Sequence, residues 1–304
     1  MTGSIDCLII GGGPAGLTAA IYAARFRLDV LVVDEGRSRA ALIPCTRNHA
    51  GFPGGISGQD LVARMREQAV EYGVRILADR VTKLSVGRKT FSATAGAHQV
   101  KARAVLLATG VTNRRPEMSE DLHRRALAAG RLRYCPVCDG FEVIDQAVAV
   151  IGTGERGAKE ALFLRAYTPA VTLVAPNGRP ALTPAQISDL DAAGIARRDG
   201  PVSSFRLAAA GLTFACAGED LTFDAVYPAM GSDPHSDLAA SVGAEIARDG
   251  CVKVDAHQRT SRRGLYAAGD VVLGLDQISH AMGQAGVAAT AIRNDLAAES
   301  PMRR

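Results

Sequence analysis

Two glycine-rich turns, each set between a strand-like and a helix-like run, constrain the fold of this chain more than any other feature. The first, Gly11–Gly16, follows the apolar run Ile5–Ile10 and precedes a helical run that reaches Arg27. Val30–Val33 then has the pattern of a second strand. A strand, a glycine turn, a helix and a strand in this order form one βαβ unit, so we predict a parallel sheet at the N-terminus.

The same pattern returns about 140 residues further along the chain. Ala147–Ile151 supplies the strand, Gly152–Gly157 the turn, Ala158–Tyr167 the helix and Val171–Val174 the closing strand. A chain of 304 residues is long enough for two domains with separate cores. We therefore predict an α/β protein with two Rossmann-like nucleotide-binding domains.

The second domain is expected to be inserted into the first. The polar, arginine-rich stretch Asn113–Glu117 suits a linker, and a second crossing near Gly243–Ala247 would return the chain to the first domain. The predicted first domain comprises residues 1–114 and 246–304, and the predicted insertion comprises residues 115–245.

Composition and charge exclude several classes of protein. A formal charge of +4 and the absence of Trp are unlike the basic, aromatic-rich stripe of a nucleic-acid binder. The uncharged run Cys7–Ala24 is not expected to be a signal peptide or membrane helix, because Gly11, Gly12, Gly13 and Pro14 interrupt it. We expect a cytoplasmic location, where the six cysteines are mostly reduced and a Cys-x-x-Cys pair is catalytic or metal-binding.

The first turn carries the groups that a bound dinucleotide requires. Gly11, Gly13 and Gly16 permit a tight turn and let a pyrophosphate approach the helix N-terminus, where free N–H groups favour an anion. Asp34, at the end of the next strand, is placed to accept hydrogen bonds from ribose hydroxyls. The alternative is a structural turn followed by an exposed aspartate.

A second acidic candidate ends a later strand. Gly264–Asp270 has the pattern of a buried strand, and Ser279–Ile292 then resembles a helix. A carboxylate at Asp270 suits the ribityl hydroxyls of a flavin, and the N-terminus of the helix could stabilise negative charge on the reduced ring. The alternative for Asp270 is a helix cap or turn residue.

The second turn keeps the glycines but lacks the recognition groups. Its closing strand continues into Ala175, Pro176 and Asn177, with neither an acidic residue for a ribose nor an arginine pair for the 2′-phosphate of NADPH. Such a fold could bind a nucleotide weakly, bind a different one or bind none. The residues therefore leave NADPH use open.

Cys135 and Cys138 are the clearest candidates for chemistry. They form a Cys-x-x-Cys pair just before the strand of the second unit, and Asp139 follows them. A structural zinc site needs four ligands, and we expect no metal because the remaining cysteines stand singly. The pair can instead close a small disulfide ring and exchange thiols, with Asp139 moving a proton. Flavin is a common partner for such two-electron chemistry, and the first nucleotide site would hold FAD.

Together these residues closely resemble the low-molecular-weight thioredoxin reductases over nearly the whole chain. The shared motifs occur in the same order, namely Gly-Gly-Gly-Pro-Ala-Gly at 11–16, Ala-Thr-Gly at 108–110, Cys-x-x-Cys-Asp at 135–139, Gly-x-Gly-x-x-Gly at 152–157 and Ala-Gly-Asp at 268–270. This order excludes the glutathione-reductase pattern, in which the dithiol lies near the first glycine motif.

The resemblance implies FAD in the first site, a homodimer and an inserted domain that swings. It also implies that Cys138 faces the flavin and that Cys135 attacks the substrate disulfide. The expected cofactor-binding residues are Gly11, Gly13, Pro14, Ala15, Gly16, Asp34, Glu35, Asn48, Thr109, Gly110, Gly269, Asp270, His280 and Ala281.

Three departures from the family pattern concern the electron supply. Ala175-Pro176-Asn177 stands where the family has His-Arg-Arg, Ala40–Ile43 replaces Gly-Gly-Gln-Leu, and Ser279–Ala281 replaces Arg-Gln-Ala. Such losses resemble thioredoxin-reductase-like enzymes that do not use pyridine nucleotides. His280 could donate to the flavin ring or act as a base, or it could be a hydrogen-bonded histidine behind the cofactor.

The leading hypothesis is an FAD-dependent thiol/disulfide oxidoreductase whose partner is a thioredoxin-like protein or a small dithiol or disulfide. Ferredoxin or another donor could supply the electrons. The alternatives are a dithiol oxidase that uses oxygen and a flavin redox sensor without turnover. An acidic partner could dock on the basic residues before the dithiol, unless these form an ordinary solvated face; they are Arg114, Arg115, Arg124, Arg125, Arg131 and Arg133.

Overall fold

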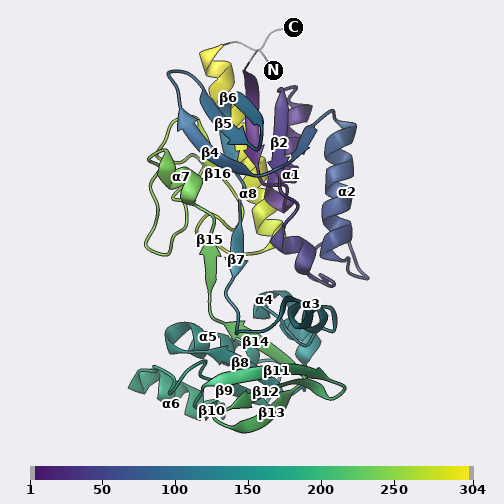
Figure 1. The fold of residues 1–304 in the computed structure, drawn as a ribbon, viewed down its shortest axis with the longest axis vertical. Helices are drawn as coiled ribbons and strands as arrows, with labels where there is room; N and C mark the ends of the chain where they lie inside the picture. Colours follow the sequence, from purple (N-terminus) through teal and green to yellow (C-terminus); the bar gives the residue numbers. More distant parts are fainter. Residues whose placement is uncertain (1–3, 301–304) are drawn as a thin grey trace. The chain divides into compact units, whose positions relative to one another are not determined.

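The computed structural model describes residues 4–300, and these form two compact units. Unit 1 comprises the described residues up to Ala41, Ser57–Thr112 and the described residues from Asp233 onward. Unit 2 comprises Leu42–Ile56 and Asn113–Ser232. Figure 1 shows the elements of both units, which are described separately below.

Two of the crossings between the units are made by short strands that pair with each other. The chain leaves unit 1 in β7 (Val111–Asn113) and returns in β15 (Ser232–Pro234). The return therefore lies at Ser232/Asp233 instead of the predicted 245/246, and not at Gly243–Ala247. The physical reason is packing, because the segment after β15 places its apolar side chains in the core of unit 1, namely Ala239, Val242 and Ala244.

Unit 1 is built on a seven-stranded sheet whose parallel part has the order β3-β2-β1-β6. Ile10 of β1 lies opposite Val33 of β2 on one side and Leu107 of β6 on the other. The bounds of these strands are β1 Ile5–Ile10, β2 Val30–Asp34, β3 Arg75–Ala78 and β6 His98–Leu107. The predicted N-terminal βαβ unit is present at the expected residues.

Strand β6 pairs with an antiparallel strand along its first half and with a parallel strand along its second half. Its first half pairs antiparallel with β5 (Phe91–Ala95), which forms a hairpin with β4 (Val81–Val86). Its second half pairs in parallel with β16 (Leu265–Ala267). The carboxyl ends of β1, β2, β6 and β16 therefore lie at one edge of the sheet, where ligands bind in open α/β sheets.

Helices cover the sheet of unit 1. Helix α1 (Pro14–Arg25) packs against α8 (Ile278–Glu299) and α2 (Gly58–Glu71), as Figure 1 shows. Small buried residues such as Ala20 of α1 and Ala288 of α8 allow the close packing. The remaining helical turns of unit 1 are η1 (Arg39–Leu42, continuing by one residue into unit 2) and α7 (Asp237–Ser241).

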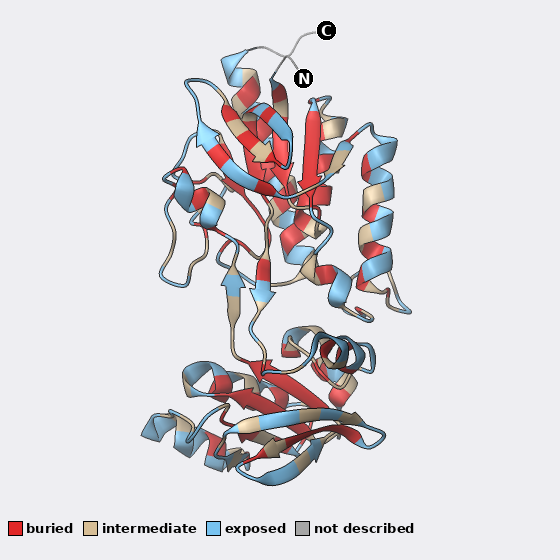
Figure 2. Cartoon of the chain, viewed as in Figure 1, coloured by how far each residue is buried: buried red, intermediate tan, exposed pale blue. Residues whose placement is uncertain are grey.

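Unit 2 contains a parallel sheet in the order β10-β9-β8-β14 and an antiparallel sheet in the order β11-β12-β13. The two faces of β8 alternate, since Val148 and Val150 pack in one core and Ala149 and Ile151 in another. Strands β8 and β14 are buried along their whole length, and Figure 2 shows them within the buried centre of unit 2. The strands are β8 Val148–Gly152, β9 Val171–Val174, β10 Ala196–Arg198, β11 Val202–Ala208, β12 Gly211–Cys216, β13 Glu219–Phe223 and β14 Ala225–Ala229.

The helices of unit 2 include α5, which follows the second glycine turn. It begins at Gly154 and ends at Leu164, earlier at both ends than the predicted Ala158–Tyr167, because the glycine turn already forms its first helical turn. The others are α3 Glu120–Ala128, α4 Pro136–Asp139, η2 Gly140–Val143 and α6 Pro184–Ala192. The prediction of an α/β protein with two Rossmann-like domains is confirmed. Among residues 4–300, no helix combines the length and the apolar character needed to cross a bilayer.

Candidate active site

The first glycine turn packs too closely for side chains. A Cβ on Gly11, whose φ is +107°, would lie 2.3 Å from the carbonyl oxygen of Ala108, and a Cβ on Gly16 would lie 1.9 Å from that of Gly11. Helix α1 starts directly after this turn with Pro14, and no side chain caps its N-terminus. The backbone N–H groups of its first turn are thus available to an anion.

Asp34 completes the first site at the end of β2. Its carboxylate is buried, with Oδ1 accepting from the Gly12 main-chain N–H at 3.0 Å and Oδ2 from Arg66 at 2.8 Å. The side chain therefore bends back toward the glycine turn, which is the position from which such a carboxylate meets a ribose. Glu35, the next residue, is exposed to solvent.

Gly269 brings three predicted parts of the site together. The φ angle of Gly269 is +81°, which side chains disfavour, and there is no room for a Cβ atom at this position. Such an atom would lie 2.9 Å from the Cβ of Ala15 and 3.7 Å from the Cβ of Ala281. The end of β16, the first turn of α1 and the first turn of α8 thus meet. Gly11 in turn lies against the Ala108-Thr109 peptide at the end of β6.

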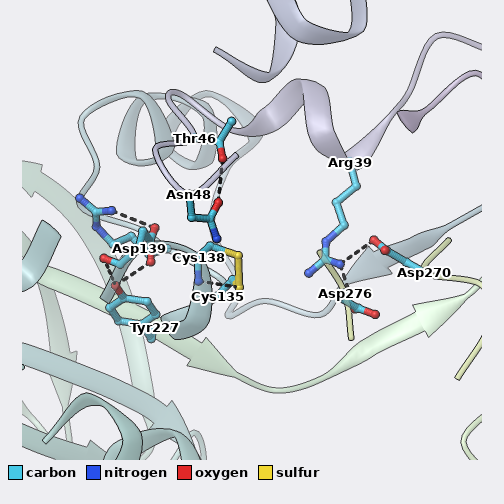
Figure 3. Close-up of a disulfide and its surroundings, with 10 residues drawn as sticks. Arg39, Thr46, Asn48, Cys135, Cys138, Asp139, Tyr227, Asp270 and Asp276 are labelled. Carbon is cyan, nitrogen blue, oxygen red and sulfur yellow. Dashed lines mark hydrogen bonds and ion pairs between the residues drawn. A yellow bond between two sulfur atoms is a disulfide. The ribbon is translucent and has the colours of Figure 1, made fainter. Parts of the chain in front are cut away.

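Asp270 lies in an ion-pair network that the sequence did not indicate. Arg39 donates to Asp270 at 2.8 Å and to Asp276 at 2.9 Å (Figure 3). These three side chains come from η1, from the end of β16 and from the segment before α8. Asp270 is therefore held in place without being a helix cap, and it remains one-fifth exposed.

His280 lies on the first turn of α8 and contacts Gln284. The His280 Nε2 atom is 3.0 Å from the amide nitrogen of Gln284. The amide oxygen of Gln284 accepts a hydrogen bond from the Gly269 main-chain N–H at 2.8 Å. The histidine is therefore linked through Gln284 to the turn that precedes Asp270. Thr109 is also engaged, since its hydroxyl donates to the His235 carbonyl at 2.7 Å.

These residues of unit 1 fit the adenosine and ribityl portions of FAD. The uncapped helix N-terminus offers donors to the pyrophosphate, and Asp34 and Asp270 offer acceptors to hydroxyl groups. The glycines leave room for close backbone approach.

The second glycine turn has the same packing but different surroundings. A Cβ on Gly157 would lie 2.8 Å from the Gly152 carbonyl carbon. The hydroxyl of Thr153, in the turn itself, accepts from the Ala181 main-chain N–H at 2.7 Å. Ala175 follows β9 and is fully buried, so an apolar methyl lies where Asp34 lies in unit 1.

Cys135 and Cys138 are joined in a disulfide at the start of α4. The S–S distance is 2.02 Å and the Cα atoms are 5.2 Å apart. Cys135 is the N-cap residue of α4, and its Sγ accepts from the Cys138 main-chain N–H at 3.2 Å. Gly140 ends the helix against the ring of Tyr167, where a Cβ would lie 2.8 Å away. Both cysteine residues are half-buried.

Asp139 points away from solvent into unit 2. Tyr227 donates to its Oδ1 at 2.8 Å and Arg133 donates to its Oδ2 at 2.8 Å, as Figure 3 shows for Tyr227. Burial raises the pKa of Asp139, while Arg133 and Tyr227 act in the opposite direction and Glu142 raises it further. Burial also raises the pKa of Tyr227 far above that of a free phenol, so this hydroxyl remains a donor.

Asn48 belongs to unit 2 in the structure. Its amide oxygen accepts from the Thr46 hydroxyl at 3.0 Å, and in Figure 3 its amide nitrogen points toward the Cys135–Cys138 disulfide. The structure therefore groups Asn48 with the dithiol. Its predicted contact with FAD stays a prediction.

Three of the other cysteines, Cys7, Cys216 and Cys251, do not resemble redox centres. Burial raises the pKa of Cys7 to about 12, and burial together with Asp249 raises that of Cys251 to about 11. Burial also raises the pKa of Cys216. Within the described part of the chain, no group of three or more His, Cys, Asp or Glu side chains could hold a metal ion.

The predicted basic surface before the dithiol is largely neutralised. Arg133 binds Asp139, Arg131 binds Asp224 at 3.4 Å, and Arg124 and Arg125 share Asp121. Arg115 pairs with Glu120. Five of the six arginines therefore carry a carboxylate partner, which favours a solvated, paired face over a docking site for an acidic protein.

Known proteins resemble this chain in sequence and fold. The family model for pyridine nucleotide-disulphide oxidoreductase matches residues 5–285. Thioredoxin reductase from Mycolicibacterium smegmatis is 33% identical over 289 residues, with 88% of each chain covered. The solved thioredoxin reductase from Streptococcus pyogenes has a TM-score of 0.90 at 26% identity, over 98% of this chain and 100% of that one. The atypical thioredoxin reductase TRi from Desulfovibrio vulgaris Hildenborough is 33% identical, with a TM-score of 0.56 over 98% and 100% of the two chains.

A dinucleotide turn with its acidic residue in one unit and a Cys-x-x-Cys disulfide in the other define a flavin disulfide oxidoreductase. The chain belongs to the pyridine nucleotide-disulphide oxidoreductase family, in its thioredoxin-reductase-like branch, and it is an FAD-dependent enzyme.

Three residues of the site were missed by reasoning from the sequence. Arg39 and Tyr227 were not considered, and Arg133 was treated only as one of a basic group. Tyr227 is the one polar-tipped side chain in the buried run of β14, and this oddity was a usable signal. Its partner Asp139 is 88 residues away and could not be found by spacing.

Proposed function

We propose that Cys135 and Cys138 form the redox-active dithiol of this enzyme and exchange with the disulfide of a thioredoxin-like protein or a small molecule. The disulfide between these two residues at the start of α4 is the observation that carries the proposal. Its ring includes only two intervening residues, and the flanking Asp139 offers a held proton site.

In the reducing direction, the Cys135 thiolate attacks the partner disulfide and forms a mixed disulfide, which expels one partner thiolate. The Cys138 thiolate then attacks Cys135 Sγ, so the partner leaves as a dithiol and the Cys135–Cys138 bond re-forms. The protein dithiol is thereby oxidised by two electrons, and Asp139 accepts or returns a proton beside it. Bound FAD supplies two-electron redox chemistry in this family, and we assign Cys138 to the side that faces it.

The surface beside the dithiol supports a protein partner. Val137, between the two cysteines, is 48% exposed, and Phe141 is 73% exposed. Apolar side chains next to a reactive disulfide suit the apolar surface around a partner's own cysteine pair. The relatives named above are thioredoxin reductases. A homodimer and a cytoplasmic location stay predictions.

We propose further that the electrons do not come from NADPH. A later segment of the chain contacts the second glycine turn, because the Ala181 main-chain N–H donates to the Thr153 hydroxyl at 2.7 Å. The buried methyl of Ala175 follows β9 in place of a carboxylate, and Arg179 is 91% exposed and paired with Asp199 at 3.5 Å. These features favour ferredoxin or another donor over a pyridine nucleotide.

Anaerobic mixing of the flavin-loaded protein with NADPH, and then with NADH, tests this proposal. We expect the flavin absorbance to persist with both nucleotides and to bleach with dithiothreitol, which enters through Cys135 and Cys138. Cys135→Ser should abolish bleaching by dithiothreitol. Fast bleaching by NADPH would overturn the proposed donor but leave the dithiol intact.

A dithiol oxidase that passes electrons to oxygen is the second candidate. The exposed His280 on the first turn of α8, held by Gln284, is the feature that favours it. Admitting air to the dithiothreitol-reduced protein distinguishes the two, since an oxidase turns over with oxygen and a reductase does so slowly. A flavin redox sensor without turnover predicts that neither nucleotide nor reduced ferredoxin bleaches the flavin at a useful rate.

A further inference from the structure

Two donors from different parts of unit 2 occupy both carboxylate oxygens of Asp139. The Tyr227 hydroxyl is 2.8 Å from Oδ1 and 3.3 Å from the main-chain oxygen of the same residue. Arg133 Nη1 is 2.8 Å from Oδ2. The carboxylate of Asp139, the residue that follows Cys138 in the chain, is therefore fixed in one orientation.

One backbone pairing positions both donors. The Arg133 main-chain N–H donates to the Val226 carbonyl at 2.9 Å, and the Val226 N–H donates to the Arg131 carbonyl at 2.9 Å. Tyr227 is the next residue in β14. Arg133 is held a second time, because its Nε donates to the Gly130 carbonyl at 2.9 Å. The segment before the dithiol and β14 thus fix the two donors relative to each other.

Tyr227 is an unusual residue for its strand. All five residues of β14 are buried, and Tyr227 is 0% exposed and among the largest fully buried side chains of the protein. A phenylalanine would fill the same volume and would need no hydrogen-bond partner. The hydroxyl therefore requires an explanation, and Asp139 is the residue to which it donates.

We propose that Tyr227 and Arg133 are positioning residues that act through Asp139 on proton transfer at the Cys135–Cys138 disulfide. This inference rests on the proposed function, in which Asp139 holds the proton. When the disulfide accepts two electrons, the S–S bond breaks and leaves two thiolates. Asp139 transfers its proton to one sulfur, which gives one thiol, one thiolate and a carboxylate that Tyr227 and Arg133 stabilise.

The charged and titratable groups that face Asp139 set the direction of the effect. Arg133 and Tyr227 lower its pKa, and Glu142 together with burial raises it. Removing either donor should raise the pKa of Asp139. Because protonated Asp139 is the active form when the Cys135–Cys138 disulfide itself is reduced, the rate of that reduction should then persist to higher pH.

The test compares Tyr227→Phe with the wild type and with Tyr266→Phe. Tyr266 is a matched control, since it is a buried tyrosine of unit 1 whose hydroxyl donates to the Asp295 carboxylate at 2.6 Å. The pKa of Asp139 is followed by NMR of aspartate-labelled protein, with its resonance assigned from Asp139→Asn. We expect Tyr227→Phe to raise this pKa by about one unit and Tyr266→Phe to leave it unchanged.

Rates of disulfide reduction by dithiothreitol give the second readout. The ratio of variant to wild-type rate at each pH removes the titration of dithiothreitol itself. The fall of the rate with pH should move upward by about one unit in Tyr227→Phe and further in Arg133→Met, with partial return in Arg133→Lys. If Tyr227→Phe does not fold, comparing Arg133→Met and Arg133→Lys with the wild type tests the same proposal.

The outcomes distinguish a failure of the positioning role of Tyr227 and Arg133 from a failure of the proton role of Asp139. A wild-type pKa and a wild-type pH profile in Tyr227→Phe and Arg133→Met, with an impaired Asp139→Asn, would overturn the positioning role alone. An Asp139→Asn variant that is reduced like the wild type at every pH would remove the proton role of Asp139 and the positioning role with it. Loss of reduction in Cys135→Ser remains expected in both cases.

Discussion

The two glycine turns of this chain have the same backbone arrangement and different chemical surroundings. In each, the last glycine packs its Cα against the first glycine of the turn, so that a Cβ on Gly16 or Gly157 would overlap main-chain atoms. After the first turn, however, Asp34 bends back to the Gly12 N–H, whereas the second is followed by the buried methyl of Ala175. The glycines thus indicate that a helix packs closely on a strand. The residue at the end of the following strand, Asp34 or Ala175, indicates whether the turn recognises a nucleotide.

The largest expected effect is a different outcome for the same substitution in the two turns. Gly16→Ala places a Cβ 1.9 Å from the Gly11 carbonyl oxygen, so the turn must open and FAD should be lost. Gly157→Ala should destabilise unit 2 but leave FAD bound, since the second turn does not hold it. The ratio of flavin to protein after purification, together with thermal unfolding, measures both effects.

Gly283→Ala is the control for these variants. Gly283 lies in α8 with open space around its Cβ position, so alanine should keep the flavin and the stability. Loss of FAD from Gly157→Ala, with FAD retained by Gly16→Ala, would reverse the assignment of the two turns.

The helices after the two turns also differ at one matched position. Ala19 and Glu160 stand three residues after the last glycine of each turn, and Ala19 is 1% exposed. Burial raises the pKa of Glu160 from 4.5 to about 7, and its Oε2 has no hydrogen-bond partner. Between pH 4.5 and about pH 7, Glu160 keeps its proton in the folded chain and loses it in the unfolded chain. The free energy of unfolding should therefore fall as the pH rises through this range.

Glu160→Gln should remove this pH dependence. The expected gain in the free energy of unfolding above pH 7 is about 3 kcal/mol, and it should disappear near pH 4.5. Urea unfolding across this range, followed by circular dichroism, measures it. Identical slopes of stability against pH in the variant and the wild type would show that Glu160 is already ionised in the folded chain.

Local patterns predicted the parts of the fold that depend on neighbouring residues. The strand Ile5–Ile10, the turn and Asp34 were predicted because apolar runs and glycines at fixed spacing have few other uses. The second crossing was misplaced because β15 is only three residues long and reads Ser-Asp-Pro, which has no apolar pattern. Its pairing with β7 is visible only in three dimensions.

The site was predictable to the same extent. Cys135, Cys138 and Asp139 lie within five residues of the sequence, so their motif indicated the chemistry. Tyr227 and Arg39 reach their partners across 88 and 231 residues, respectively, and these contacts depend on strand order and on a three-way meeting of loops. No spacing rule in the sequence encodes such contacts, although a tyrosine in a fully buried strand does indicate that a partner exists.

A smaller effect is expected from the recognition group of the first turn. Asp34→Asn keeps the shape of the side chain but removes the charge that accepts from Gly12, Arg66 and a ribose. FAD should bind about 10- to 100-fold more weakly, the range for hydrogen bonds to a charged group. Fluorescence titration of the apoprotein with FAD measures the affinity. Asp199→Asn, which removes only an exposed partner of Arg179, is the control and should bind as the wild type does.

The smallest expected effect concerns the hydrogen bond between the Ala181 main-chain N–H and the Thr153 hydroxyl of the second turn. Thr153→Val removes the acceptor of the Ala181 N–H and should lower the free energy of unfolding by about 1 kcal/mol, with FAD content unchanged. Thr153→Ser keeps the hydroxyl and should restore most of the loss, which urea unfolding can measure. Equal stabilities for the valine and serine variants would mean that the bond does not hold this segment over the turn. The case against NADPH would then rest on the buried methyl of Ala175 and on the exposed Arg179, which is paired with Asp199.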